Sequence, residues 1–410
     1  MAKPKIRFKG YTNDWEQRKL GDILISLQNN TLSRADLSNE SGIAKNVHYG
    51  DLLIKFGEVL DVSKERLPMI LDECVLTKYK ASFLQNGDVV VADTAEDSTV
   101  GKCSEIAGLN NEIVLSGLHT IPYRPVEKFA TGYLGYYLNS GAYHNQLIPL
   151  MQGIKVTSIS KSAMHDTDIV YPKSVEEQGK IGDYFQSFDR LITLHQRKCD
   201  QAKKLKKYML QKMFPKNNKS VPEIRFEGFS NDWEQRKLGD IAAFINGRAY
   251  SQDELLSSGK YKVLRVGNFY TNDSWYYSDM ELDDKYYAEK GDLLYTWSAT
   301  FGPHIWRGDK VIYHYHIWKI ELSKALEKSF ALQLLEQDKQ AILSDKNGST
   351  MVHITKSGME GKEVLLPRNI DEQAKIGNYF STLDNLVTLH QKKCDQLKNL
   401  KKFMLQNMFV

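Results

Sequence analysis

Two segments of the chain carry apolar residues at alternating steps of three and four positions. The first stripe consists of Ile181, Phe185, Phe188, Ile192, His195, Cys199, Ala202, Leu205, Met209 and Met213. The second stripe consists of Ile376, Phe380, Leu383, Val387, His390, Cys394, Leu397, Leu400, Met404 and Met408. A 3-4 stripe held over about five heptads is typical of a coiled coil. Because so narrow a stripe buries little on a globular surface, we expect each helix, about 60 Å long, to pair with a helix of equal length.

Both predicted helices have start signals. Ser174 precedes Glu177 by three positions, and Asn369 precedes Glu372 by three, with a proline just upstream in each case. This spacing predicts a capping box, in which a side-chain acceptor and a reciprocal glutamate satisfy the first backbone N–H groups. Two unrelated amphipathic helices, each lying on its own domain, are the alternative. The matched stripes favour an intramolecular antiparallel pair. Such a pair would relate the two segments, and the domains that precede them, by a pseudo-two-fold axis.

Polar residues within the stripes have simpler interpretations than metal binding. His195 and His390 occupy equivalent positions, and no carboxylate or cysteine set with ligand spacing accompanies them. We therefore interpret them as interface residues. Cys199 and Cys394, one turn further on, are interpreted as small packing residues. The basic run at 203–207 is interpreted as a solvated face.

An internal repeat organises the whole chain. Residues 6–23 and 224–241 are identical at 15 of 18 positions. Residues 177–214 and 372–409, which contain the two stripes, are identical at 26 of 38 positions. Between them lie stretches of little similarity, roughly 24–165 and 242–360, the second being about 23 residues shorter. A constant frame with divergent inserts indicates one structural task done twice and two different binding tasks.

Each insert mixes short apolar runs with turns and predicts an α+β domain. Gly87-Asp88 and Gly291-Asp292 lead into buried-strand patterns, and further strands are expected at 113–122 and 310–321. Helices are expected at 128–147 and 325–344, each followed by a polar loop at 153–164 or 348–359. The predicted fold is thus two α+β domains separated by a pair of long antiparallel coiled-coil helices. The predicted boundaries are 1–172, 173–215, 216–367 and 368–410.

The inserts also contain side chains suited to binding DNA. Arginine pairs with guanine and asparagine with adenine in the major groove, while lysine and hydroxyl groups bind phosphate. In the first insert the candidates are Arg34, Lys45, Lys155, Thr157, Ser160 and Lys161. In the second they are Arg248, Arg265, Asn268, Tyr270, Trp275, Ser298 and Lys356. An ordinary surface or capping role is the alternative for each of them, so the loops as groups are the firmer prediction.

Composition and charge narrow the class of protein only a little. The net charge of +4 is compatible with a nucleic-acid partner without establishing one. Four scattered cysteines give no CxxC pair, which favours a reducing cytoplasm and predicts no zinc site. No run approaches 18 apolar residues, and the N-terminus has no apolar core of a signal peptide. Common phosphate-loop, dinucleotide, metalloprotease and hydrolase motifs are absent, so we expect no catalysis and no metal site.

The repeated entry segments and the repeated EQxKIGxYF…TLHQ helices resemble the specificity subunits of type I restriction–modification systems. The resemblance covers essentially the whole chain. It implies two target-recognition domains, each of which binds one half of a bipartite, asymmetric DNA target. It also implies helices that set the spacing and dock modification subunits and restriction subunits, two of each. It assigns S-adenosylmethionine, ATP and Mg²⁺ to those partners and none to this chain. The alternatives are a coiled-coil adaptor whose end domains bind proteins, and a self-sufficient nuclease or methyltransferase.

Overall fold

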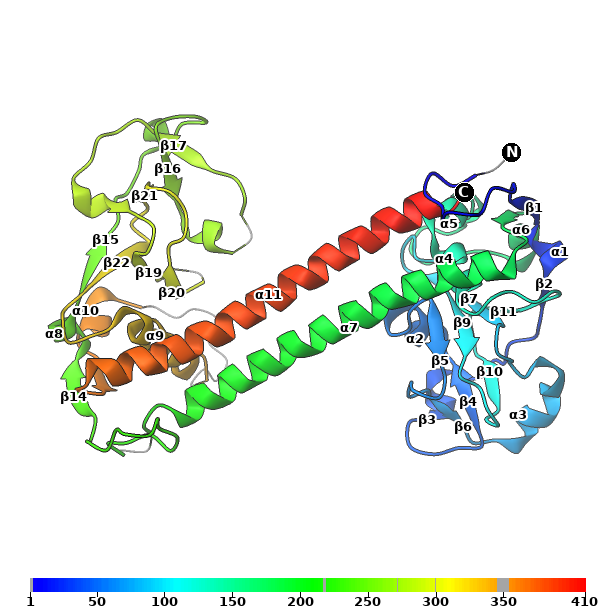
Figure 1. Ribbon diagram of the computed structural model, residues 1–410, viewed down its shortest axis with the longest axis horizontal. Helices are drawn as coiled ribbons and strands as arrows, with labels where there is room; N and C mark the ends of the chain where they lie inside the picture. The colour runs from blue at the N-terminus through cyan, green and yellow to red at the C-terminus, as the bar shows by residue number, and fades with distance from the viewer. Residues whose placement is uncertain (1–2, 217–218, 271, 299, 345–353) are drawn as a thin grey trace. The chain divides into compact units, whose positions relative to one another are not determined.

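The computed structural model describes residues 3–216, 219–270, 272–298, 300–344 and 354–410. The chain forms two compact units. Unit 1 comprises Met1–His195 and Lys392–Val410, and unit 2 comprises Gln196–Gln391. The long helices α7 (Val175–Lys212) and α11 (Ile370–Met408) each contribute one part to unit 1 and one part to unit 2 (Figure 1).

In unit 1 the first part of α7 packs against the last part of α11 in the opposite direction. The Cys394 Sγ lies 3.6 Å from the carbonyl oxygen of Ile192, and the Lys401 Nζ lies 2.6 Å from the Asp189 Oδ1. From Asp189 to Ile192 the residue number rises along α7, whereas from Lys401 to Cys394 it falls along α11. The two helices therefore run antiparallel. This confirms the predicted pairing. Cys394 occupies a small-residue position at the helix interface, as expected.

Unit 2 repeats the arrangement with the roles of the helices exchanged. The Cys199 Sγ lies 3.8 Å from the carbonyl oxygen of Val387, and the Lys206 Nζ lies 2.6 Å from the Asp384 Oδ1. Lysine at an interface position tolerates only a register that supplies a carboxylate, so such residues specify register at some cost in stability. The same lysine–aspartate ion pair therefore fixes the helix register in both units.

The predicted stripe is wrong at one position in each helix. Leu205 and Leu400 are 43% and 47% exposed, and the neighbouring lysines Lys206 and Lys401 face the partner helix instead. The stems of these lysines lie at the interface while their ammonium groups reach the aspartates. Of the remaining predicted interface residues, Ile181, Phe185, Phe188, Ile376, Phe380 and Leu383 are buried, and Ile192, His195, Met209, Val387, His390, Leu397 and Met404 are half-buried.

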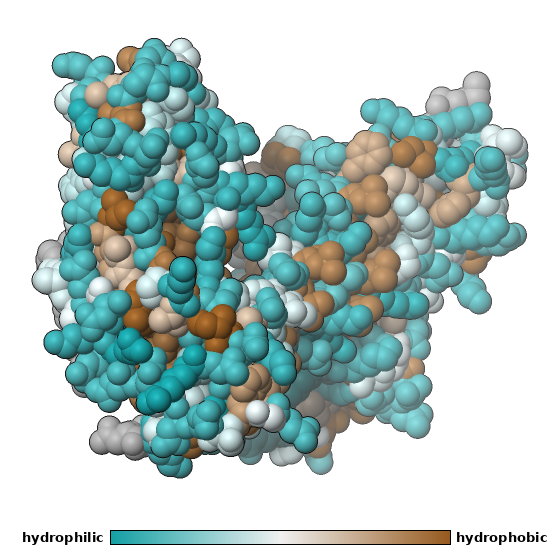
Figure 2. All heavy atoms as spheres, turned by 60° about the vertical axis from the view of Figure 1, so that its left-hand side comes forward, coloured by the Kyte–Doolittle hydropathy of each residue, from teal (hydrophilic) through white to brown (hydrophobic). Residues whose placement is uncertain are grey.

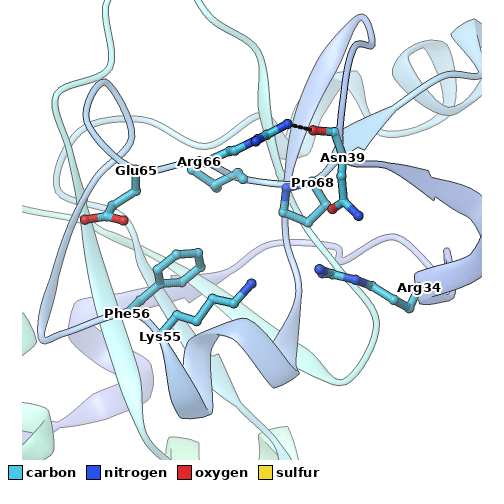
Figure 3. Close-up of a pocket in the computed structure, with 8 residues that line it drawn as sticks. Arg34, Asn39, Lys55, Phe56, Glu65, Arg66 and Pro68 are labelled. Carbon is cyan, nitrogen blue, oxygen red and sulfur yellow. Dashed lines mark hydrogen bonds between the residues drawn. The ribbon is translucent and has the colours of Figure 1, made fainter. Parts of the chain in front are cut away.

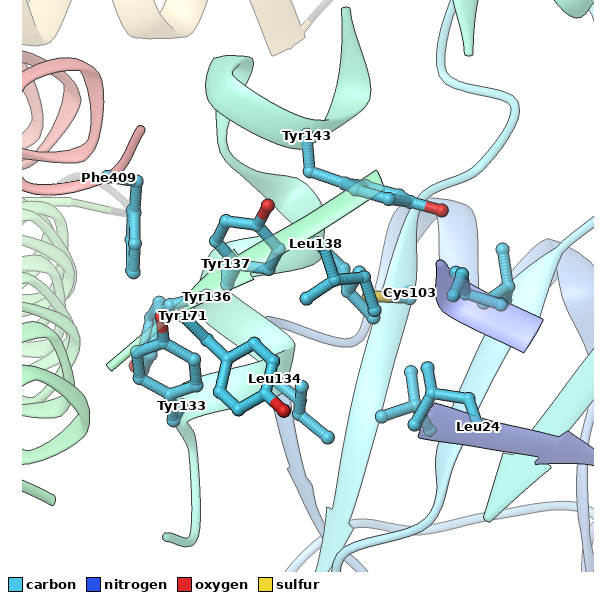
Figure 4. Close-up of a cluster of buried hydrophobic side chains, with 14 of the residues drawn as sticks. Leu24, Cys103, Tyr133, Leu134, Tyr136, Tyr137, Leu138, Tyr143, Tyr171 and Phe409 are labelled. Carbon is cyan, nitrogen blue, oxygen red and sulfur yellow. The ribbon is translucent and has the colours of Figure 1, made fainter. Parts of the chain in front are cut away.

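The last residues of both long helices enter the core of the unit in which they end. Phe409 stacks on Phe185 with ring centroids 5.6 Å apart. It also meets Tyr137 edge-on at 5.5 Å (Figure 4). In unit 2, Phe214 stacks on Phe330 at 5.5 Å. The repeated Met-Phe pair at the end of each copy thus anchors each helix in an apolar, aromatic cluster.

The starts of the long helices are joined to the entry segments by buried ion pairs. Glu177, 2% exposed, accepts hydrogen bonds from the Nε and Nη2 of Arg7 at 2.6 and 2.9 Å. Glu372 accepts the same pair of bonds from Arg225 at 2.7 and 2.8 Å. Ser174 accepts from the backbone N–H of Glu177, and Asn369 accepts from that of Asp371. Both oxygens of each glutamate, however, bind arginine. The capping-box prediction is corrected accordingly: the N-cap acceptors are present, and the glutamates hold the entry segments.

Unit 1 contains a larger and a smaller sheet in its described residues. The larger has the order β2-β11-β7-β9-β5, and the smaller has the order β10-β4-β6-β3. Their strands are β2 (Leu24–Ser26), β3 (Leu37–Ser38), β4 (Ala44–Val47), β5 (Val59–Asp61), β6 (Met69–Ile70), β7 (Val89–Ala92), β9 (Cys103–Ala107), β10 (Val114–Ser116) and β11 (Thr120–Pro125). Two strand pairs complete the unit: β1 (Glu16–Lys19) with β13 (Asp168–Tyr171), and β8 (Thr94–Ala95) with β12 (Thr157–Ser158).

Short helices connect these strands. They are α1 (Leu20–Ile23), α2 (Tyr49–Ile54), α3 (Glu73–Lys78), α4 (Tyr133–Asn139), α5 (Gly141–His144) and α6 (Lys161–His165), with 3₁₀ turns at Arg34–Asp36, Lys80–Ser82 and Ile148–Leu150. The single helix expected at 128–147 is therefore wrong, because an extended Ser140 separates α4 from α5. Tyrosines of α4 fill the core beside Leu134 and Leu138, as Figure 4 shows.

Unit 2 has sheets of order β15-β22-β19-β20 and β17-β16-β21-β18 among its described residues. Their strands are β15 (Ala242–Asn246), β16 (Tyr261–Leu264), β17 (Tyr276–Ser278), β18 (Tyr287–Ala288), β19 (Leu293–Thr296), β20 (Gly302–Ile305), β21 (Val311–Tyr313) and β22 (Ile317–Leu322). The entry strand β14 (Glu234–Lys237) pairs with β23 (Glu363–Leu366). The helices are α8 (Leu238–Ile241), α9 (Lys328–Ser344) and α10 (Lys356–Glu360), with 3₁₀ turns at Gln252–Glu254, Val266–Phe269 and Asp284–Tyr286.

The two inserts share one strand frame although their sequences differ. In each, a parallel pair (β4 with β10, β16 with β21) leads into an antiparallel central pair (β7 with β11, β19 with β22). The strands expected at 113–122 and 310–321 are each two strands with a turn between them, which corrects the prediction. Much of the shortening of the second insert lies between β16 and β19, the counterpart of β4 to β7.

Removing one member of a buried ion pair tests the junction. Arg225→Met leaves Glu372 buried without its cation, so we expect the free energy of unfolding of unit 2 to fall by about 3–5 kcal/mol. Urea unfolding followed by circular dichroism measures this. Replacing both residues by methionine removes the uncompensated charge and should restore much of the loss. A single variant as stable as the wild type would contradict the assignment.

Candidate nucleic-acid interface

The shared frame brings one pair of loops together in the same way in both units. In unit 1 the backbone N–H of Asp93, which follows β7, donates to the carbonyl oxygen of His119, which precedes β11, at 3.2 Å. In unit 2 the N–H of Trp297, after β19, donates to the carbonyl of His316, before β22, at 3.1 Å. His119 and His316 are therefore equivalent residues, one in each unit.

His119 has an unusual backbone conformation and polar neighbours. Its φ of +56° is the left-handed region, which a residue with a Cβ adopts at a cost of order 1–3 kcal/mol. Its ring lies 5.2 Å from that of Tyr49, and its Nδ1 lies 3.6 Å from the Asp93 Oδ1. Burial lowers the pKa of the neighbouring His48, whose ring accepts a hydrogen bond from the N–H of Gly50. An exposed imidazole is thus held in place from several sides.

Four of the sequence candidates in unit 1 lie on one segment beside His119. Thr157 pairs with Ala95 in the β8–β12 ladder, and Ser160 caps α6 by accepting from the N–H of Ala163. Lys155 precedes this ladder, and Lys161 begins α6. The N–H of Ile159 donates to the carbonyl of Asp93 at 2.9 Å, which joins the segment to the His119 loop. The first predicted polar loop is therefore one structured surface.

The other two candidates of unit 1 lie elsewhere. The Nη1 of Arg34 lies 2.5 Å from the Oδ2 of Asp51 on α2. The Nζ of Lys45, on β4, donates to the carbonyl of Val62 at 2.7 Å and to Glu112 at 3.2 Å. The structure does not bring them to the polar loop, and their roles toward DNA stay predictions.

In unit 2 the candidate Tyr270 covers a buried polar cluster. Its hydroxyl lies 3.1 Å from the Nε2 of His304 and 3.3 Å from the Oγ1 of Thr296, and its side chain is 40% exposed. His304 stacks on Phe269 with ring centroids 4.2 Å apart. Burial, helped by the charge of Lys339, lowers the pKa of His304 to about 4, so its ring is neutral at physiological pH. Tyr270 thus presents an amphipathic ring from a supported position.

Other candidates in unit 2 are engaged inside the unit. Arg248 donates to both carboxylate oxygens of Glu254, at 2.9 and 2.6 Å. The guanidinium of Arg265 lies over the ring of Tyr276 at 4.2 Å. Asn268 accepts from the N–H of Arg265 and donates to two carbonyls of the following turn. These contacts build the loops that carry them.

The last candidates sit at the edges of the described loops. Trp275 packs against Trp306, with the ammonium of Lys262 5.2 Å from its ring centre. Ser298 lies just beyond β19, and Lys356 begins α10 and pairs with Glu360. Of the second predicted polar loop, residues 348–353 lie outside the described residues.

The sequence candidates missed a ring cluster in unit 2. Tyr315 is 39% exposed, and its ring lies 3.9 Å from that of His316. The Nε1 of Trp297 donates to the carbonyl of Tyr315 at 2.9 Å. A sequence signal existed, since a histidine stands directly before an apolar strand in both inserts, in HTIPY at 119–123 and HIWKI at 316–320. The offset between these histidines differs from that of the long helices, so comparison at a single offset does not align them.

Among the described residues, no group of three or more His, Cys, Asp or Glu side chains is placed to hold a metal ion. No described helix is both long and apolar enough to cross a bilayer. In the view of Figure 2, hydrophilic side chains cover most of the facing surface, and apolar ones form separate small patches.

Comparison with known proteins identifies the family. The model for the type I restriction modification DNA specificity domain matches twice, at residues 12–204 and 230–399. The chain belongs to this family. The family model thus matches each unit's entry strand and insert, and it includes most of each long helix. The resemblance drawn from the repeated segments is confirmed.

Relatives of this specificity family extend over the whole chain. A Methanocaldococcus jannaschii protein named as the MjaX type I restriction enzyme specificity subunit is 24% identical over 95% of the chain and 91% of its own length. The MjaVIII specificity subunit of the same organism is 26% identical over 44% of the chain. The crystal structure of an S subunit from M. genitalium covers all of the chain, with a TM-score of 0.65 at 15% identity. A chain from a type I system structure concerned with complex assembly covers 97%, with a TM-score of 0.52 at 17% identity. These likenesses confirm the predicted fold.

The paired histidines can be tested by substitutions that suit the backbone. Asparagine tolerates the left-handed region, so His119→Asn should leave the unfolding midpoint unchanged while weakening target DNA binding by roughly tenfold, the value of about one base contact. His316→Asn should weaken binding similarly through unit 2. Fluorescence anisotropy with the chain assembled with its modification subunits measures both. Wild-type affinity in both variants would remove the histidines from the interface.

Proposed function

We propose that each unit of this specificity subunit binds one half of a bipartite, asymmetric DNA target. The observation that carries this is a common strand frame with different side chains on equivalent loops. His119 lies beside Asp93 and Tyr49 in unit 1, whereas His316 lies beside Trp297 and Tyr315 in unit 2. Because hydrogen-bonding groups on the loops distinguish base pairs, equal frames with unequal loops imply two different half-sites.

The helix pair supplies the spacing between the half-sites in this proposal. Lys401–Asp189 in unit 1 and Lys206–Asp384 in unit 2 fix one antiparallel register. We expect this register to set the gap between the half-sites, much as DNA-binding dimers space half-sites by multiples of about 34 Å, one helical turn.

Exposed apolar side chains on the helices form the proposed docking surface for modification subunits. In unit 1 these are Leu191 and Leu194 on α7 and Leu400 and Phe403 on α11, between 43% and 52% exposed. Leu191 directly precedes the interface residue Ile192, and Leu400 directly precedes Lys401. In an antiparallel pair, positions that precede interface residues on the two helices lie on the same side. The four side chains therefore border one face of the helix pair.

Unit 2 carries the same set of exposed side chains, namely Leu386, Leu389, Leu205 and Tyr208. Two equal surfaces favour two modification subunits, one bound to each. The chain itself performs no chemistry in this proposal. S-adenosylmethionine, ATP and Mg²⁺ belong to the modification subunits and to two restriction subunits, and the assembly acts on double-stranded DNA in the cytoplasm.

A protein-binding adaptor is the alternative function. It predicts binding that does not depend on DNA sequence or on salt, whereas a DNA-binding subunit loses affinity steeply as salt rises. The match to the DNA specificity family favours the DNA-binding function.

Exchange of one insert tests the division into two half-sites. Replacing residues 24–165 by the corresponding insert of another member of the family should change one half of the methylated target and leave the other half and the gap unchanged. Mapping N6-methyladenine in cells that carry the system measures this. A change in both halves, or in neither, would refute the proposal.

Charged substitutions test the docking surface. Leu191→Asp with Leu194→Asp should abolish binding of one modification subunit, because burying unpaired carboxylates at an apolar interface is costly. Adding Leu386→Asp and Leu389→Asp should abolish the second. Mass measurement of the assembly gives the stoichiometry, and Arg197→Asp, a charge change at another exposed position of α7, is the control. Full assembly with all four leucines replaced would show that docking occurs elsewhere.

A further inference from the structure

A cavity of about 470 Å³ opens in unit 1 and is lined in part by Arg34, one of the sequence candidates that lie away from the polar loop. Three of its lining side chains are the cations Arg34, Lys55 and Arg66, and Glu65 is the acidic side chain among them (Figure 3). Phe56 and Pro68 add apolar walls. The cavity is therefore a basic recess on a domain that binds DNA.

Two of the cations are positioned by one buried carboxylate. Asp51 on α2, with its side chain 8% exposed, lies 2.5 Å from the Nη1 of Arg34 and 2.7 Å from the Nζ of Lys55. Burial alone would raise the pKa of Asp51, but hydrogen bonds from Lys55 and Arg34 outweigh burial and hold it below its usual value. Because one negative charge holds two positive ones, an excess positive charge is left toward the cavity.

The third cation approaches from a different segment. The Nη2 of Arg66, in the loop between β5 and β6, donates to the backbone carbonyl of Asn39 at 2.6 Å. In Figure 3, Lys55 and Arg34 lie below and beside the cavity, while Arg66 lies above it. Counting Asp51 and Glu65 against the three cations leaves a net charge of +1. Guanidinium groups present fixed donor forks that match the oxygens of a phosphate.

We propose that this cavity binds a backbone phosphate of the DNA next to the half-site recognised by unit 1. The inference rests on the proposed function of that unit. It assigns Lys55 and Arg66, which the sequence did not single out, to phosphate contacts, and it gives Arg34 the same role rather than that of a base reader.

Helix α2 connects the cavity to the His119 surface. Its first residue, Tyr49, lies 5.2 Å from His119 between ring centroids, and Lys55 is its C-cap. At 1.5 Å per residue, six residues separate the two sites by about 9 Å. Each strand presents one phosphate per about 3.4 Å of the duplex axis, so one duplex can reach both sites.

The cavity also accounts for a difference between the inserts. Lys55 and Arg66 lie between β4 and β7, the stretch that is longer in unit 1 than its counterpart between β16 and β19 in unit 2. Six of the eight residues that line the recess come from this longer stretch. The phosphate contact therefore belongs to unit 1, and the two halves of the target contribute unequally to the salt dependence of binding.

Salt titrations of binding test the proposal directly. Lys55→Gln and Arg66→Gln are made in the full chain, assembled with its modification subunits, and affinity for a duplex carrying the mapped target is measured between 50 and 200 mM KCl. Each lost phosphate contact should reduce the slope of log affinity against log salt by about 0.9. The preference for the target over a scrambled duplex should stay unchanged. Arg66→Lys, which keeps the charge, should retain most of the slope.

Controls separate the possible outcomes. Lys78→Gln, an exposed lysine on α3 outside the cavity, should leave the slope unchanged. Unaltered slopes in both cavity variants overturn the proposal, and so does a lost target preference at an unaltered slope. Calorimetry with ATP and with inorganic phosphate tests a second ligand source. Suppose that either compound binds saturably, that Arg66→Gln abolishes this binding, and that the salt slope of DNA binding is unaltered. The cavity is then assigned to a free phosphate compound instead of DNA. A wild-type assembly that does not prefer its target over a scrambled duplex contradicts the proposed function. Even then, the salt slopes of the wild type and the cavity variants on any duplex still test the phosphate contact.

Discussion

A lysine–aspartate ion pair, made twice, is the constraint on which this architecture depends. Lys401 with Asp189 and Lys206 with Asp384 each place an ammonium group inside the helix interface, beside the buried residues Cys394 and Cys199. An apolar stripe alone tolerates sliding by a heptad, whereas an interface lysine without its carboxylate loses its partner. Since each pair lies in a different unit, register is set independently at two places along the same two helices. Half-exposed ion pairs contribute little to the free energy of unfolding. Their main effect here is therefore to specify the register of the two helices.

The repeated residues outside the stripe serve the junctions between helix and domain. Glu177 and Glu372 bind the arginines of the entry segments, and Gln178 and Gln373 bind the carbonyls of Pro172 and Pro367. The same glutamines accept backbone N–H groups from the inserts, at Ala130 and Glu327. Two adjacent side chains thus hold entry segment, insert and helix together. This explains why the entry segments and the helices recur almost unchanged while the inserts between them differ.

Sequence patterns predicted the elements that have a regular spacing of apolar residues or that occur twice in the chain. The helices, their antiparallel pairing and the α+β class followed from the 3-4 stripe and the duplicated segments. The pattern misplaced Leu205 and Leu400 because a lysine stem can occupy an interface position while its ammonium group reaches an aspartate of the partner helix. It also missed the equivalence of His119 and His316, since insertions between strands shift the alignment of the inserts. Arg34 was found by residue type, but its neighbours Lys55 and Arg66 reach the same cavity only through the tertiary fold, which no local pattern encodes.

The division between frame and loops also explains the modest net charge. Under the proposed function, a frame that docks partners through leucines and holds its register through ion pairs needs no broad basic surface. Positive charge is required only where phosphates approach, and at the cavity it is concentrated by burying one carboxylate beneath two cations. Several arginine and asparagine side chains in unit 2 are used to shape the loops, so fewer are left to contact bases. In the proposed function, then, discrimination depends on a few supported side chains, and a change of target requires a change of loops while the frame stays the same.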